Sequence, residues 1–346
     1  MNYLEFYKLK EEPFSSAPDI KFYYNSAQHS KALVRLMYTV DSMKGLAILI
    51  GDIGTGKTTL ARRMLDSLPE EEYESALLVI IHSGITADWL LKKISMQLGV
   101  SAPSDNKITL LSQLYERLSQ LYEQKRKAVV LIDEAQMLKN KEMMEEFRGL
   151  LNLEASDRKL ITFVFFGLPE IEENLKLDEP LSQRVALRYK LESFNYESTE
   201  AYIKHRLSLA GSKDSIFADD TVVKIHTYSQ GIPRMINIIS SNALFEGFLL
   251  KAKQIDSKII DAVASDLGLN KGEKDKKFTA EDIKEQIDYA EKPKITEQQG
   301  QSKARIDKPQ PSEPPPSAKA APSGPKTEKP EEVDEIDSIL SKLEKG

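Results

Sequence analysis

The residues with the most recognisable chemistry form a glycine-rich stretch near position 55. In order they are Gly51, Asp52, Ile53, Gly54, Thr55, Gly56, Lys57, Thr58 and Thr59. In such a loop the glycines let backbone N–H groups face an anion, the lysine reaches β- and γ-phosphates, and the threonine after it ligates Mg²⁺. The stretch therefore predicts a site for a nucleoside triphosphate. A glycine-rich turn before a helix is the simpler alternative.

Two adjacent acids, Asp133 and Glu134, follow directly after the apolar run 128–132. Because the carboxyl ends of parallel strands share one sheet edge, we expect these acids to lie beside the glycine-rich loop. Asp133 is then placed to hold Mg²⁺, directly or through its water, and Glu134 to polarise the water that attacks the γ-phosphate. A helix N-cap with an acidic first turn is the alternative interpretation of the pair.

Three arginines are candidates for contacts to bound phosphates. Arg184 lies in the stretch 181–189, which is expected to lead to a last short strand. An arginine at such a helix-to-strand junction can point into a neighbouring subunit's nucleotide, a role worth about 10³ to 10⁵ in rate. Arg188 is a second candidate for that role, and a surface cation or an ion pair with the acids of 170–173 is the alternative for both. Arg234 follows the turn at Gly231, at the start of a helix from which it can reach back to the phosphates.

The elements that position these residues alternate along the chain. Apolar, β-branched runs predict strands of a parallel sheet that are buried on both faces, at 46–50, 76–81, 128–132 and 160–166. Helical periodicity predicts helices at 27–43, 60–68, 89–98, 110–122 and 143–153. This alternation indicates an α/β sandwich that binds ligands at the carboxyl ends of its strands. His29, near the start of the first helix, is interpreted as a polar cap or surface residue rather than a catalytic base.

The segments outside the sandwich differ in composition. Residues 1–25 are rich in aromatics and prolines, and they form either an irregular arm over the core or a wall against an adenine ring. From 193 to 268 helical patterns dominate, which predicts a smaller helical domain. From about 270 the chain is rich in Lys, Glu, Gln, Pro and Ser, a composition that favours a disordered tether. Within 331–346 the apolar residues fall on one helical face, so this end is either a partner-docking helix or an unimportant nascent helix.

Bulk composition is that of a soluble protein of up to two folded domains, with 346 residues, 40% hydrophobic and 29% charged. The net charge of −6 provides no global attraction to nucleic acid or to an anionic membrane, and the absence of cysteine suits a reducing compartment. We see no basic leader segment and no apolar run of membrane-spanning length, so we expect a cytoplasmic protein without a transmembrane segment.

The motifs GDIGTGKT, VVLIDEAQ, LSQRV and GIPRMIN, in this order and spacing, resemble those of an AAA+ ATPase. The opening YLEFYKLKEEPFSSAPD and the stretch LLNLEASDRKLITFVFFGLPEIEENL are similar to the ExeA-type family, the general secretion pathway protein A and pilus biogenesis ATPases. The resemblance covers residues 1–268. It implies a P-loop NTPase (AAA+) parallel sheet sandwich at 1–192, a helical lid at 193–269, a disordered linker at 270–330 and a short docking helix at 331–346.

The resemblance also assigns roles to single residues. It implies ATP and Mg²⁺ as ligands, with Lys57 on the phosphates, Thr58 and Asp133 on the metal, and Glu134 as the catalytic base. It makes Arg184 the trans-acting arginine and Arg234 a lid sensor that contacts the nucleotide, and it makes the N-terminal arm a neighbour of the purine.

One position departs from the family. Relatives usually carry glutamine where this chain has Leu168, which implies slow hydrolysis. Secretion members often carry a membrane span and a peptidoglycan-binding domain after the ATPase; we find neither in this sequence, which favours the shorter pilus- or exopolysaccharide-associated relatives.

Three functions follow as hypotheses. The first is a homo-oligomeric ATPase that supports assembly of a secretion or type IV pilus-like envelope machine, and that is recruited to the inner membrane by a partner bound to the C-terminal helix. The second is a transposition-type, ATP-dependent DNA-binding regulator, against which the near balance of charges argues. The third is a nucleotide-dependent scaffold with slow turnover.

Overall fold

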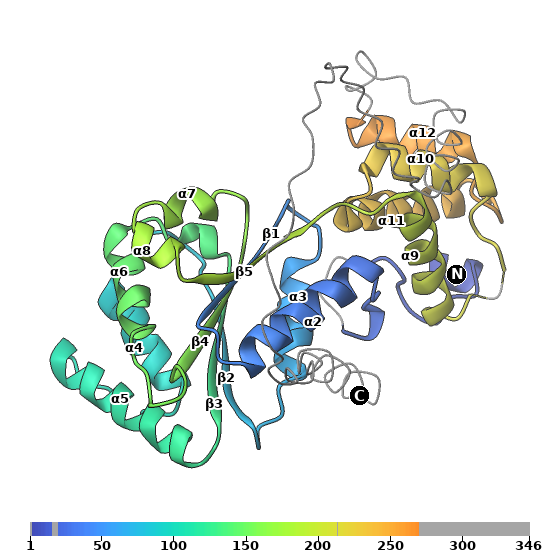
Figure 1. Cartoon of the computed structure of the whole chain (residues 1–346). Coiled ribbons are helices and arrows are strands. Elements are labelled where there is room, and N and C mark those ends of the chain that lie inside the picture. The colour runs from blue at the N-terminus through green and yellow to red at the C-terminus, as the bar shows by residue number, and fades with distance from the viewer. Residues whose placement is uncertain (1, 16–19, 213, 270–346) are drawn as a thin grey trace, which may run out of the picture.

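A five-stranded parallel sheet forms the centre of the larger part of the molecule (Figure 1), in the strand order β2-β3-β4-β1-β5. We describe residues 2–15, 20–212 and 214–269 of a computed structural model. The predicted linker at 270–330 and docking helix at 331–346 lie outside these residues. The strands are β1 (Leu46–Gly51), β2 (Tyr73–Val79), β3 (Lys127–Asp133), β4 (Ile161–Gly167) and β5 (Val185–Leu191).

Strand side chains alternate between two cores. In β1, Leu46 and Ile48 pack into the core on one face of the sheet, while Ala47 and Leu49 pack into the core on the other. Strands β3 and β4 alternate in the same way, which explains why their sequences are continuously apolar. The predicted α/β class is confirmed.

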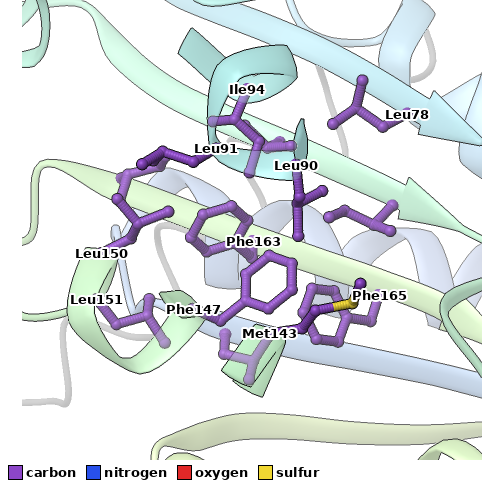
Figure 2. Packing of buried hydrophobic residues seen from close by; sticks show 14 of the residues in the cluster. Leu78, Leu90, Leu91, Ile94, Met143, Phe147, Leu150, Leu151, Phe163 and Phe165 are labelled. Carbon is purple, nitrogen blue, oxygen red and sulfur yellow. The ribbon is translucent and has the colours of Figure 1, made fainter. Parts of the chain in front are cut away.

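Helices cover both faces of this sheet. Those that cover the first face are α4 (Ala87–Gln97), α5 (Lys107–Glu123), α6 (Lys141–Leu150), α7 (Ile171–Leu175) and α8 (Glu179–Ser182), and those on the second face are α2 (Ala27–Asp41) and α3 (Lys57–Asp66). Figure 2 shows the first core, where the ring of Phe147 stands edge-on to Phe163 and Phe165 at centroid distances of 5.0 and 4.8 Å. These packed layers hold the strand ends in fixed positions.

Two strand predictions were wrong in detail. Strand β2 spans Tyr73–Val79 rather than 76–81 and lies at the edge of the sheet, with Leu78 in the core on one face and Tyr73 in the core on the other, so the predicted strand continued too far at its C-terminal end. Val79 and Ile81 are 47% and 81% exposed. An edge strand lacks a neighbour on one side, a property that its apolar composition does not reveal. Strand β5 starts at Val185, inside the segment expected to precede it.

The second part of the molecule is helical and consists of α9 (Tyr196–Leu209), α10 (Asp219–Ser229), α11 (Pro233–Leu249) and α12 (Ser257–Asp266). The N-terminal arm, with α1 (Tyr3–Phe6) and the 3₁₀ turn η1 (Ile20–Phe22), runs beside these helices (Figure 1). Tyr7, Leu9 and Phe14 join the core of the helical part, and the Tyr7 hydroxyl donates to the carbonyl of Ala252 at 2.9 Å. The first half of the arm therefore packs on the lid helices. The domain boundaries themselves stay a prediction.

No helix in the described ranges has the length and apolar character needed to span a bilayer.

Candidate nucleotide-binding site

The glycine-rich loop connects β1 to α3 and owes its shape to three glycines. Gly54 and Gly56 have φ angles of +83° and +101°, which glycine adopts without strain. A Cβ on Gly51 would stand 2.7 Å from the carbonyl oxygen of Leu191 in β5. Thr55 is buried, and its hydroxyl donates to the carbonyl of Asp52 at 2.8 Å. The loop thus places the N-terminus of α3 at the carboxyl edge of the sheet.

Lys57, in the first turn of α3, is buried against this loop. Its ammonium donates to the carbonyls of Gly51 and Asp52 at 2.8 and 2.9 Å. Burial lowers the pKa of Lys57, and the carboxylates of Glu134 and Asp133 oppose that shift. The ammonium of Lys57 therefore lies close enough to Asp133 and Glu134 to interact electrostatically with both carboxylates. Of the other loop residues, Ile53 and Thr59 line the cavity described below, and the Asp52 side chain is exposed.

Asp133 ends β3 and faces Thr58. Its Oδ1 accepts the backbone N–H of Glu134 at 2.9 Å, whereas its buried Oδ2 has no hydrogen-bond partner among the described residues. Burial raises the pKa of Asp133, and the Thr58 hydroxyl opposes the shift. A buried, orphaned carboxylate oxygen next to a threonine hydroxyl fits one side of a Mg²⁺ shell, which phosphate oxygens and water complete. A site made entirely of acids and histidines is absent from the described ranges.

Glu134 adopts a left-handed backbone conformation, with φ +56° and ψ +36°. Such strain in a non-glycine residue is concentrated at functional positions. The carboxylate accepts the side-chain amide of Gln136 at 2.5 Å. The carbonyl end of that amide accepts the backbone N–H of Leu168 at 3.1 Å. Gln136 thereby links Glu134 to the end of β4, where Leu168 itself presents no polar side chain.

Arg184 lies at the other edge of the sheet. The register pairs Leu46 with Val185 and Gly51 with Leu191, so Arg184 precedes the amino end of β5 while the loop follows the carboxyl end of β1. Its Nη1 is buried without a hydrogen-bond partner, and it forms no ion pair within the described residues. Arg188 instead pairs with Glu172 through Nε at 3.4 Å, the alternative considered for it. Arg184 is therefore far from the loop of its own chain.

Arg234 lies in the first turn of α11 and contacts the loop directly. Its backbone N–H donates to the carbonyl of Gly54 at 3.2 Å, and a Cβ on Gly54 would stand 2.7 Å from the Arg234 Cβ. The turn before it requires Gly231, whose φ is +68° and whose added Cβ would lie 2.0 Å from the Phe194 carbonyl oxygen. The close contact between Gly231 and the Phe194 backbone fixes the turn that precedes α11.

His29 is not a surface residue, contrary to expectation. It is 4% exposed, and the helix cap is Ser26. The imidazole Nδ1 lies 2.7 Å from the Ser26 hydroxyl and Nε2 lies 3.2 Å from the carbonyl oxygen of Thr55. A Cβ on Gly56 would stand 2.9 Å from Nε2. His29 therefore packs against the glycine-rich loop at Thr55 and Gly56 and supports its backbone.

A cavity of about 580 Å³ joins the loop, the arm and the lid. Its phosphate-loop end contains Lys57, Thr58 and Glu134, with Gln136 and Leu168 beside them. Its other end is formed by residues of the arm and the lid, which are Phe22, Tyr23, Tyr24, Phe194, Tyr202, Arg206 and Asn237. The volume suits a nucleotide-sized ligand. Phe22, Tyr23 and Tyr24 of the arm thus line the cavity, a position that the interpretation of the arm as a wall against an adenine ring requires.

Sequence reasoning missed three residues of this site: His29 as a support of the loop, Gln136 as a partner of Glu134, and Arg206 as a lining residue. His29 and Arg206 stand at no spacing that marks a role, because they act through contacts between distant segments. Gln136 alone had a signal, since it is two residues from Glu134.

Comparisons with known proteins agree with this geometry. Residues 40–175 match the AAA domain family. The chain is 36% identical over 250 residues to general secretion pathway protein A of Aeromonas hydrophila, a match that covers 71% of this chain and 45% of that protein. The chain thus spans less than half the length of this relative.

Two solved structures share the fold. The ORC1 protein of Aeropyrum pernix in complex with DNA is 16% identical with a TM-score of 0.55, covering 75% of this chain and 70% of that one. The Walker-type ATPase of Pyrococcus abyssi is 17% identical with a TM-score of 0.52, covering 80% and 81%. At these identities the likeness shows the fold alone. With the parallel sheet, the glycine-rich loop and the extended sequence match together, the chain belongs to the ExeA-like family of AAA+ ATPases.

Proposed function

We propose that the chain binds Mg-ATP in this cavity, between subunits of a homo-oligomer, and hydrolyses it to ADP and phosphate. The observation that carries the proposal is the meeting of Lys57, Thr58, Asp133 and Glu134 at one sheet edge, with Asp133 Oδ2 left without a partner in the described part of the chain. Such an arrangement combines a phosphate-binding cation with a metal-binding acid and a base.

Each residue has a distinct role in this proposal. The N–H groups of the loop and Lys57 bind the β- and γ-phosphates. Thr58 and Asp133 would hold Mg²⁺, whose chemistry is to neutralise charge on the phosphate oxygens. Glu134 orients the attacking water and accepts its proton. Arg234 contacts the nucleotide from the lid, which its backbone contact with Gly54 supports.

The trans-acting arginine requires a second subunit. Arg184 lies at the sheet edge opposite the loop of its own chain, so within one chain it cannot reach the bound phosphates. We therefore expect turnover per chain to rise with protein concentration.

The experiment measures ATP binding and phosphate release in the full chain and two variants. Lys57→Ala is expected to abolish ATP binding, and Glu134→Gln to keep binding, lose turnover and accumulate an ATP-bound oligomer. Turnover per chain that does not depend on protein concentration would contradict the shared site. Undiminished turnover in Glu134→Gln would remove the assignment of the base.

For the cellular role we propose support of a secretion or type IV pilus-like envelope machine, from the cytoplasm, with recruitment to the inner membrane by a partner. The name of the Aeromonas hydrophila relative supports secretion. The partner would bind the segment 331–346. A pull-down with the isolated segment 327–346 tests this role.

A DNA-binding regulator is the second candidate, and the DNA-bound Aeropyrum pernix ORC1 structure, with its related fold, favours it. It predicts an ATP-stimulated shift of duplex DNA that weakens steeply with salt. A slow-turnover scaffold is the third candidate, supported by Leu168 at the end of β4.

A further inference from the structure

Arg206 is a buried cation in the wall of the cavity, and no phosphate-binding motif includes it. It lies on α9 and is 4% exposed. A buried charge is costly unless ion pairs or hydrogen bonds compensate it. The contacts of Arg206 therefore indicate what its guanidinium binds.

These contacts leave most of the guanidinium unsatisfied. Nη1 donates to the hydroxyl of Tyr202 at 2.9 Å, and this is the one hydrogen bond of the group within the described ranges. Nε is buried and has no acceptor there, and no carboxylate forms an ion pair with Arg206 among the same residues. A guanidinium has five N–H donors. Nε is therefore a buried donor without an acceptor, and Nη2 has no acceptor among the described residues.

Two aromatic rings cover the guanidinium without satisfying its hydrogen-bond donors. The guanidinium carbon lies 5.1 Å from the centroid of Phe22 and 5.4 Å from that of Tyr202. Such contacts stabilise the charge through the face of the ring. The N–H bonds lie in the guanidinium plane, however, so they need acceptors at its edge. A planar ligand with acceptor atoms on its own edge meets this requirement.

The position of Arg206 within the cavity identifies which part of a nucleotide it meets. The Tyr202 hydroxyl donates to Asn237 at 2.9 Å, and Asn237 lies one turn beyond Arg234 on α11. Arg206 is thus connected through Tyr202 and Asn237 to α11, and the arm residue Phe22 covers its guanidinium. With the phosphates on Lys57, this end of the cavity receives the base.

We propose that Arg206 binds the nucleobase, donating its in-plane N–H groups to ring-nitrogen or carbonyl acceptors of a purine. The proposal rests on the function proposed above. Tyr202 and Asn237 position the guanidinium, and Phe22 covers it. Arg206 then contributes to affinity for the base and not for the triphosphate.

The test compares two ligands, ATP and inorganic tripolyphosphate, both with magnesium and measured by calorimetry. Arg206→Met removes the donors and keeps much of the volume. We expect the dissociation constant for ATP to rise about tenfold or more, because charged hydrogen bonds are lost, while that for tripolyphosphate stays within about twofold. The control is Arg62→Met, the same change at an exposed position of α3 outside the cavity, and it should alter neither constant.

Arg206→Lys keeps the charge and removes the planar fork, so it replaces the methionine variant if that variant does not fold. A selective loss of ATP affinity is expected here too, because the fork geometry carries the recognition. Equal losses for ATP and tripolyphosphate, or an unchanged ATP constant, would overturn the base-binding role while wild-type binding remains. If the wild type binds neither ligand, the nucleotide site itself fails.

Discussion

The pH dependence of folding tests the position of His29 beneath the phosphate loop. Burial lowers the pKa of His29 from 6.5 to about 4, and the Thr55 carbonyl opposes the shift only in part. The unfolded chain therefore takes up a proton as the pH falls below 6.5, where the folded chain does not. The contribution of the neutral, buried His29 to the free energy of unfolding is complete above pH 6.5 and is lost as the pH falls towards 4.

The size of this effect follows from the two pKa values. A difference of one pKa unit corresponds to about 1.4 kcal/mol, and most of the proton uptake by the unfolded chain lies above pH 5. Between pH 8 and pH 5 we therefore expect the loss from His29 to be about 2 kcal/mol. For a protein whose stability is about 5 to 15 kcal/mol, this loss is readily measured.

The assay is urea unfolding followed by circular dichroism at pH 8 and pH 5, with the wild type compared with His29→Gln. Glutamine is a neutral donor at both values and removes the titration. The pKa of His226 is also lowered by burial, but this group titrates in both proteins and cancels in the comparison. The variant should lose about 2 kcal/mol less than the wild type between the two pH values. Identical losses would refute the buried, neutral state of His29.

Two further variants test the turn at Gly231 and the support of Glu134. Gly231→Ala should lower the free energy of unfolding by about 2 kcal/mol or more, because φ is +68° and the Cβ would meet the Phe194 carbonyl oxygen at 2.0 Å. The matched control Gly149→Ala lies in α6 with nothing within 4 Å, and it should be neutral or stabilising by up to about 1 kcal/mol; equal losses in urea unfolding would contradict the role of this turn. Gln136→Ala should lower ATP turnover by about 10- to 100-fold with ATP affinity unchanged, since orienting partners act on this scale. Full turnover in that variant would show that Glu134 needs no orienting amide.

Much of the fold is readable from local patterns. The strand, loop and helix around Gly54 and Lys57 depend on residues that are adjacent in sequence. The placement of Asp133 and Glu134 at the end of a buried strand depends on adjacent residues in the same way. The edge position of β2 was missed because apolar composition does not specify how many neighbours a strand has.

The sequence by itself determined the class of fold, the glycine-rich loop between β1 and α3, and the acids at the end of β3, because each depends on a short pattern with one local conformation. Tertiary structure alone decided that His29 supports the loop, that Gln136 connects Glu134 to β4, and that Arg206 closes the far end of the cavity. These roles arise where chain segments as distant as Phe22 and Arg206 pack together. A residue's burial and its partners are set by that packing and carry no signature in the neighbouring sequence.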